Sequence, residues 1–340
     1  MQRSEKRSLA GRVGWLLVAS TLTLALGACS STPPKAIPEP ELRATPEGVR
    51  FEMRYFYGQD GTRLFRQAWI PEGQARGVLV IVPGLKDHGG RYAELGQQLA
   101  KEGFAVFAGD LRGHGYSSGP RQMTESFNDY LVDLALLVRQ TRKQLPGMPT
   151  FLLGNDMGGL IAARFVETVP TAVQGLAVSG APLAIKDSKY KLLGMKILAK
   201  VAPSSAALSP ELKAYSQDPL VVQALLSDPL VTPTGVPVKT MVQQVEAIRT
   251  LQEQQERLSV PMLVMHGISD GLNPLFGSIA LYDSVPSDNK ALKQYPDLAH
   301  DLWHESGNTE VTTDLGDWMN GLLIRQQVAK RKAAQAVTGN

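Results

Sequence analysis

The sequence predicts a doubly wound α/β fold, with a mostly parallel sheet, helices on both faces and an inserted helical lid. Apolar runs that end in glycine or aspartate alternate with segments of helical period, and this alternation stops between about residues 182 and 258. Buried parallel strands are typically short apolar runs of this kind, and their alternation with helices is typical of a doubly wound sheet. The predicted strands lie in residues 77–84, 104–110, 150–154, 173–180 and 261–267.

An antiparallel hairpin is predicted ahead of these strands. Residues 51–57 and 62–70 are rich in aromatic and aliphatic side chains, and the turn sequence GQDG separates them. Glycine and aspartate between two such runs favour a tight turn. Residues 91–103 and 127–145 then supply the first two helical patterns between strands.

The predicted lid contains two helical patterns, residues 189–202 and 238–258, with no strand pattern between them. Met195 and its leucine and isoleucine neighbours lie among lysines. Such a stripe either packs into the core or faces lipid, and the pattern alone leaves both interpretations open.

The N-terminus has the layout of a bacterial secretory signal. Arginines and lysines precede the apolar run of residues 13–29, which ends in Leu-Gly-Ala-Cys and resembles a lipoprotein lipobox. We therefore expect residues 1–28 to be a signal peptide and Cys29, the only cysteine, to carry lipid. Ser30 in place of an aspartate indicates delivery to the outer membrane, with the protein facing the periplasm.

The rest of the chain divides into three parts. Residues 29–50 form a proline-rich tether, residues 51–325 a domain of catalytic size, and residues 326–340 a frayed basic tail. The net charge is only +3 and the basic residues are spread out, so nucleic-acid binding is not expected. No metal-ligand spacing recurs among the histidines, and neither a metal nor a cofactor is expected.

Residues 154–158 have the pattern of a nucleophile elbow, G-x-nucleophile-x-G, between a predicted strand and a predicted helix. Asp156 occupies the nucleophile position. Asp270 and His300 follow later strand patterns in the order nucleophile, acid, histidine. These three residues are the predicted catalytic triad.

The other histidines are weaker candidates. His304 ranks second to His300 because it falls four residues later, on a predicted helix. His266 ends a predicted strand before a turn and His88 lies in the loop after another, and we expect both to support loops.

Several motifs together resemble the monoacylglycerol lipase and lysophospholipase group of α/β-hydrolases, also called serine-aminopeptidase-like hydrolases. The likeness runs from about residue 53 to residue 320 and includes VPGLKDHGGRY, GDLRGHGYSSGPR, the elbow, YSQDPLVVQALLSDPLV, HGISD and AHDL. The resemblance implies the α/β-hydrolase fold and a small apolar or lipid-like substrate. It also implies that Leu85 and Met157 form the oxyanion hole, with Asp270 and His300 as acid and base.

Two positions depart from the pattern of this group. Pro83 stands where the family usually has histidine, before the oxyanion glycine, and Asp156 stands where it has serine. A carboxylate beside donated N–H groups at a helix N-terminus predicts a lowered pKa and a permanent charge. Its attack on an ester would give a mixed anhydride that collapses back to substrate, so serine-type acyl transfer should be lost.

An aspartate can instead attack a saturated carbon and form an alkyl-enzyme ester, as epoxide hydrolases and haloalkane dehalogenases of this fold do. His300 would then activate the water that hydrolyses the ester. Those enzymes generally have tryptophan after the nucleophile, whereas this chain has Met157, which disfavours dehalogenation. Epoxide opening needs lid donors, and Tyr190 and Tyr215 are the candidates.

The alternative is a catalytically retired protein that binds a lipid-like ligand or a protein partner under its lid. The presence of both Asp270 and His300 favours catalysis, because a retired site needs neither.

Overall fold

The structure is a computed structural model that describes residues 38–41, 44–185, 189–208, 214–232 and 234–338. The predicted signal peptide, Cys29, Ser30 and part of the tether lie outside the described residues. The side chain of Tyr190 lies outside them as well.

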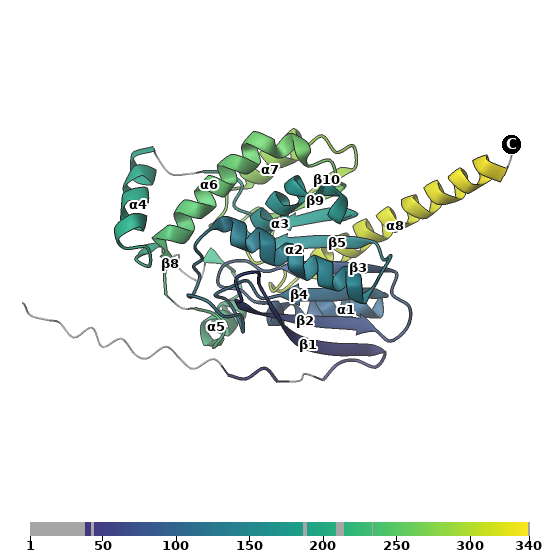
Figure 1. The fold of residues 1–340 in the computed structure, drawn as a ribbon, viewed down its shortest axis with the longest axis horizontal. Coiled ribbons are helices and arrows are strands. Elements are labelled where there is room, and N and C mark those ends of the chain that lie inside the picture. Colours follow the sequence, from purple (N-terminus) through teal and green to yellow (C-terminus); the bar gives the residue numbers. More distant parts are fainter. Residues whose placement is uncertain (1–37, 42–43, 186–188, 209–213, 233, 339–340) are drawn as a thin grey trace, which may run out of the picture. The chain divides into compact units, whose positions relative to one another are not determined.

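An eight-stranded sheet forms the centre of the described fold, in the order β1-β2-β4-β3-β5-β6-β9-β10 (Figure 1). β2 pairs antiparallel with both of its neighbours, and the strands from β4 to β10 pair in parallel. The predicted hairpin and parallel strands are therefore confirmed. The strands are β1 (Val49–Tyr57), β2 (Arg63–Pro71), β3 (Gly77–Val82), β4 (Phe104–Gly109), β5 (Thr150–Asn155), β6 (Gly175–Ser179), β9 (Met262–Gly267) and β10 (Lys290–Tyr295).

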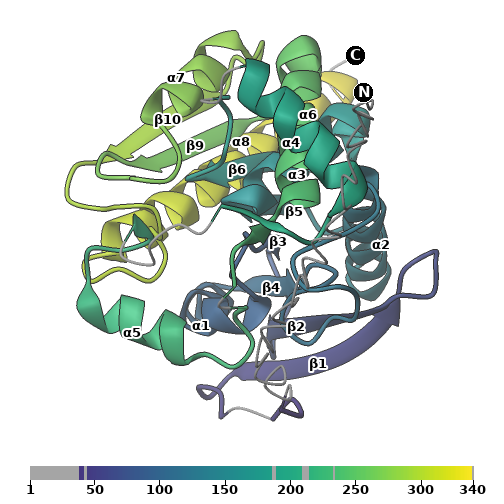
Figure 2. The same cartoon turned by 90° about the vertical axis from the view of Figure 1, so that its left-hand side faces the viewer.

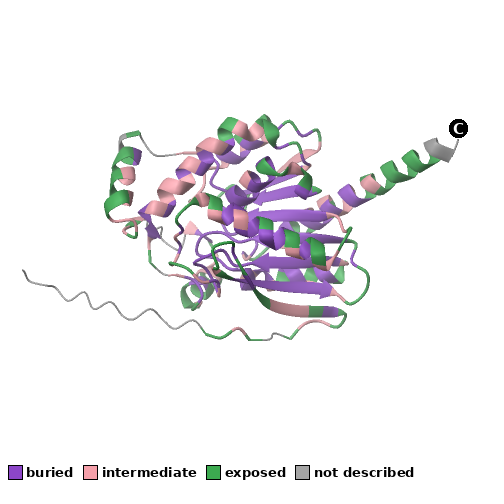
Figure 3. Cartoon of the chain, viewed as in Figure 1, coloured by how far each residue is buried: buried purple, intermediate pink, exposed green. Residues whose placement is uncertain are grey.

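Two apolar cores cover the two faces of the sheet. One contains side chains from α2, α3 and α6, and the other contains side chains from α1 and α8. β3, β4, β5, β6 and β9 are buried along their whole length, which explains their continuous apolar sequences (Figure 3). These helices are α1 (Ala93–Lys101), α2 (Phe127–Gln144), α3 (Met157–Thr168), α6 (Val238–Gln254) and α8 (Thr309–Thr338). A further helix, α7 (Leu275–Ser284), follows β9 and precedes β10 in the chain.

Local sequence accounts for where α2 begins. The Ser126 hydroxyl accepts a hydrogen bond from the N–H of Asn128, and the Asp129 carboxylate accepts one from the N–H of Ser126. This reciprocal arrangement satisfies N–H groups that the first helical turn leaves without partners.

Between β6 and β9 the chain leaves the sheet and forms α4 (Lys189–Val201), β7 (Ala206–Leu208), α5 (Pro219–Ser227), β8 (Val236–Pro237) and α6. We call this segment the lid. α4 and α6 lie side by side (Figure 2). The expectation that no strand separates them is wrong, because β7 pairs with β8. Strands of two and three residues are too short to give a periodic signal.

The apolar stripe of α4 is largely exposed. Leu193, Ile197 and Val201 are 57%, 59% and 76% exposed, whereas Leu192 is buried. Of the two interpretations of the stripe, burial in the core therefore does not apply to these three side chains.

The prediction of a frayed tail is wrong for residues 326–338, because they continue α8 to Thr338. Trp318 and Met319 pack under the sheet in the first half of this helix, while residues 329–335 are exposed. No helix in the described ranges has the length and apolarity that a membrane crossing requires.

Candidate active site

The elbow at the carboxyl end of β5 holds Asp156 in a strained backbone conformation. Its φ is 48° and its ψ is −127°, which a residue other than glycine rarely adopts. The N–H of Asp156 donates to the carbonyl of Ser179 on β6 at 2.9 Å, and α3 begins at the next residue. A Cβ at Gly158 would lie 2.0 Å from the carbonyl oxygen of Val82, so the elbow can approach β3 only with glycine there.

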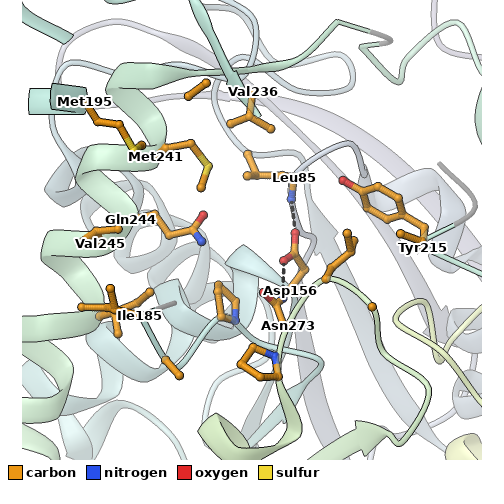
Figure 4. A pocket seen from close by; sticks show the side chains of 18 of the residues that line it. Leu85, Asp156, Ile185, Met195, Tyr215, Val236, Met241, Gln244, Val245 and Asn273 are labelled. Atoms are coloured by element: carbon orange, nitrogen blue, oxygen red, sulfur yellow. Dashed lines mark hydrogen bonds between the residues drawn. The ribbon is translucent and has the colours of Figure 1, made fainter. Parts of the chain in front are cut away.

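The loop after β3 supplies a donor to this carboxylate. The N–H of Leu85 donates to Asp156 Oδ2 at 3.0 Å (Figure 4). A Cβ at Gly84 would lie 2.7 Å from the same oxygen. Pro83 therefore does not prevent the loop from directing its N–H at the elbow.

β3 and β5 are neighbours, and connections leave them toward opposite sides of the sheet, so the site lies at a topological switch point.

His300 and Asp270 form a close pair on the loops that follow β10 and β9. His300 Nδ1 lies 2.9 Å from Asp270 Oδ2. The other carboxylate oxygen of Asp270 accepts the N–H groups of Leu272 and Asn273, each at 2.8 Å. With its carboxylate fixed in this way, Asp270 can orient the imidazole.

The other side of the imidazole faces Asp156. His300 Nε2 lies 3.8 Å from Asp156 Oδ1, which is too long for a hydrogen bond. Instead, Asn273 Nδ2 donates to this oxygen at 3.1 Å. The fold therefore brings Asp156, Asp270 and His300 together with a space between the imidazole and the elbow carboxylate.

The predicted direction of the Asp156 pKa is wrong. Burial raises the pKa of Asp156 and outweighs the opposing effects of His300, of the N–H groups of Met157 and Leu85, and of Asn273. The donated N–H groups do favour the anion, but desolvation of the buried carboxylate is the larger effect.

The pKa values of His300 and Asp270 shift in the directions that favour an ion pair between them. Burial disfavours the imidazolium of His300, but Asp270 and Asp156 outweigh it and raise its pKa to about 9. Burial also opposes ionisation of Asp270, yet the charge and hydrogen bond of His300 hold its pKa below the usual value. At neutral pH His300 is therefore protonated beside an ionised Asp270.

Tyr215 lies against the triad. Its ring packs edge-on against His300, with centroids 5.4 Å apart, and its carbonyl accepts the N–H of Asp301. Burial raises the pKa of the Tyr215 phenol, and the charge of Asp156 adds to this. The phenol keeps its proton at neutral pH and can donate it.

The other candidate histidines serve neighbouring loops. His304 contacts Asp301 at 2.6 Å and the carbonyl of Arg91 at 3.0 Å. His88 contacts Asp228 of the lid at 2.9 Å. His266 contacts Ser278 and the carbonyl of Asn273.

A cavity of about 550 Å³ lies between Asp156 and the lid (Figure 4). Asp156 and Leu85 are at the sheet side, and Met195 and Met241 come from α4 and α6. Its lining is mostly apolar, and the remaining labelled lining residues are Ile185, Tyr215, Val236, Gln244, Val245 and Asn273. Such a cavity suits an apolar ligand.

Sequence reasoning missed two residues that contact the site or its loop. Asn273 lies three residues after Asp270, and this proximity was the only available signal. Lys86 follows Leu85 with a φ of 54°, and its ammonium donates to the carbonyls of Thr232 and Thr234 in the lid. No group of three or more potential metal ligands occurs in the part of the chain that the structure describes.

An elbow after a central strand, a histidine paired with an acid on later strand ends, and a lid over the same edge define an α/β-hydrolase. Residues 73–307 match the family model for serine aminopeptidase, S33, and the chain belongs to this hydrolase family.

Relatives and solved structures agree with this assignment. The chain is 32% identical to a monoacylglycerol lipase of Mycolicibacterium smegmatis over 78% of this chain and 95% of that protein. It is 31% identical to the human monoglyceride lipase, over 84% of this chain and 95% of the relative. The crystal structure of the Paleococcus ferrophilus monoacylglycerol lipase superposes with a TM-score of 0.68 at 26% identity, covering 76% of this chain and 98% of that one. The chain is thus a hydrolase-family member similar to monoacylglycerol lipases.

Proposed function

We propose that this protein hydrolyses a small apolar or lipid-like epoxide through an alkyl-enzyme ester on Asp156. One observation carries the proposal: an elbow carboxylate lies at the base of an apolar cavity, 3.8 Å from an imidazole that is paired with a second acid. The named relatives act on monoacylglycerols, which supports a lipid-like substrate.

In the first step Asp156 Oδ1 attacks one ring carbon of the epoxide. A carbon–oxygen bond forms to Asp156 and the ring carbon–oxygen bond breaks, while Oδ2 stays at the N–H of Leu85. The ring oxygen takes a proton from Tyr215. The resulting phenolate is reprotonated by the His300 imidazolium, directly or through water.

Formation of the ester prepares the second step. Because the ester is neutral, the negative charge of Asp156 no longer raises the pKa of His300, and the imidazole can act as a base. It takes a proton from water, and the hydroxide adds to the Asp156 carbonyl carbon. The tetrahedral intermediate then collapses, and the bond between the aspartyl carbon and Oδ1 breaks. The diol leaves with Oδ1 and takes the proton of the hydroxyl that was added to the aspartyl carbon. Asp156 is then again a carboxylate and His300 an imidazolium.

Mass analysis in heavy-oxygen water tests this route. After turnover of an epoxide panel, the peptide that contains Asp156 should carry the heavy isotope, because water attacks the aspartyl carbon. Asp270 is also an aspartate of the site but forms no ester, so its peptide is the internal control. Turnover without label in Asp156 would exclude the alkyl-enzyme.

The second candidate function is a retired hydrolase that binds a lipid-like ligand or a protein partner. The hydrogen bonds of Asp156 favour it, because Leu85 and Asn273 already occupy both carboxylate oxygens. A protein that binds the epoxides or monoacylglycerols in its cavity, but never turns them over, would support this candidate.

We also propose that lipid on Cys29 anchors the protein in the bacterial outer membrane, facing the periplasm. The support is the lipobox-like sequence and Ser30. Labelled palmitate should enter the wild-type chain and not a Cys29→Ala variant. Equal incorporation in both would overturn the anchor.

A further inference from the structure

Asn273 is fixed between the two acids of the site. Its N–H donates to Asp270 Oδ1 at 2.8 Å, and its carbonyl lies 3.2 Å from His266 Nε2. Its side-chain Nδ2 lies 2.7 Å from the carbonyl oxygen of Gly180, the residue that follows β6. The position of this side chain is therefore set by the loop after β9 and by the strand beside it.

The second contact of Nδ2 is Asp156 Oδ1, at 3.1 Å (Figure 4). A carbonyl oxygen and an ionised carboxylate accept hydrogen bonds and do not donate them. The NH₂ end of the amide must consequently face both groups, and it has one hydrogen for each.

Oδ1 is also the oxygen of Asp156 that faces His300 Nε2, across 3.8 Å. An imidazolium and a carboxylate that share a buried site attract strongly and favour a charge-assisted hydrogen bond below about 3 Å. The amide of Asn273 competes for this oxygen and is anchored to Gly180, so it restrains the carboxylate.

We propose that Asn273 is a positioning residue that holds the Asp156 carboxylate short of a direct hydrogen bond with His300. The purpose of this spacing rests on the proposed function: it leaves Nε2 of His300 free for the water that hydrolyses the alkyl-enzyme. Within the described residues, the charged and titratable groups that bear on His300 include Asp270, Asp156, Asp301, His266 and Tyr215. The Asn273 side chain donates to only one of these groups, Asp156.

An Asn273→Leu variant tests the spacing independently of catalysis. Leucine keeps the backbone contacts to Asp270 and His266 but removes the amide. Asp156 should then close on His300 and raise the imidazole pKa by about one unit above the wild-type value, since a nearer opposite charge favours the charged form. An NMR titration of the His300 ring measures this shift.

Gln244→Leu is the matched control, because it removes another amide from the wall of the same cavity. It should leave the His300 pKa unchanged. An unchanged or lower pKa in Asn273→Leu would overturn the positioning role. If that variant does not fold, Asn273→Ser, whose hydroxyl is too short to bridge both acceptors, is judged by the same criterion.

Measurements of turnover distinguish a failure of the proposed function from a failure of the positioning role of Asn273. If the wild-type protein turns over no epoxide and gains no label, the proposed function fails, while the titration still decides the role of Asn273. If turnover occurs, rapid-quench analysis of Asn273→Leu should show alkyl-enzyme accumulating, with its hydrolysis slowed about tenfold or more.

Discussion

The two acids on either side of His300 are the same residue type in opposite environments. Asp270 lies 2.9 Å from the imidazole and accepts two backbone N–H groups on a loop, and its pKa falls. Asp156 lies 3.8 Å away at a strained elbow facing an apolar cavity, and its pKa rises. Close hydrogen bonding thus stabilises the charged form of Asp270, whereas burial disfavours the charged form of Asp156.

Replacing Asp156 is expected to give the largest effect. Asp156→Ser puts an alcohol beside a complete His300–Asp270 pair, so hydrolysis of short acyl esters should rise about 10³-fold over the wild-type protein. Initial rates on nitrophenyl esters measure the gain. Adding His300→Ala should abolish it, whereas a folded but silent Asp156→Ser would favour the binding-protein candidate.

Replacing Asp270 should lower both turnover and stability, because its carboxylate is held by hydrogen bonds to His300, Leu272 and Asn273. Asp270→Asn is expected to lower epoxide turnover about 10³-fold, because the imidazole loses its orientation and its charge partner. A carboxyl with a lowered pKa stabilises the fold above its usual pKa, and that contribution is lost as the pH falls. The variant should therefore lose more stability at pH 7 than at pH 3 in thermal denaturation, and an equal loss at both would contradict the ionic role.

Two glycines extend the comparison to the backbone of the two regions. Gly158→Ala places a Cβ against the carbonyl oxygen of Val82, and about 3 kcal/mol or more of unfolding free energy should be lost. Gly271→Ala, next to Asp270, meets only the Cβ of Ala214 at 3.8 Å and should be nearly neutral. Urea denaturation of both variants measures the difference, and similar losses would show that the elbow is not the more constrained region.

The smallest expected effect concerns the charge of Asp156 on His300. Asp156→Asn should lower the His300 pKa from about 9, by less than Asp270→Asn does, because Asp270 is the nearer and stronger partner. The imidazole would then lose its proton at a lower pH. NMR titrations of both variants compare the shifts, and a larger shift from Asp156→Asn would reverse the assigned roles.

Sequence patterns predicted the sheet, the elbow and the meeting of Asp156, Asp270 and His300, because each depends on local strand ends and chain order. The same patterns could not predict Asn273, since its side chain reaches an elbow 117 residues away in the chain. They also gave the wrong direction for the Asp156 pKa, because desolvation depends on what covers the carboxylate. Helix α5 was missed because its sequence, PLVVQALLS, is apolar at nearly every position and shows no helical period, and the β7–β8 pair because its strands have only three and two residues.

Lys86 links the loop after β3 to the lid. Its ammonium is buried against the carbonyls of Thr232 and Thr234, and its neighbour Leu85 directs an N–H at Asp156. An outward movement of Thr232 and Thr234 would break these hydrogen bonds to the ammonium or would also move the loop after β3. The positions of Thr232 and Thr234 and the direction of the Leu85 N–H toward Asp156 are therefore coupled through the contacts of Lys86.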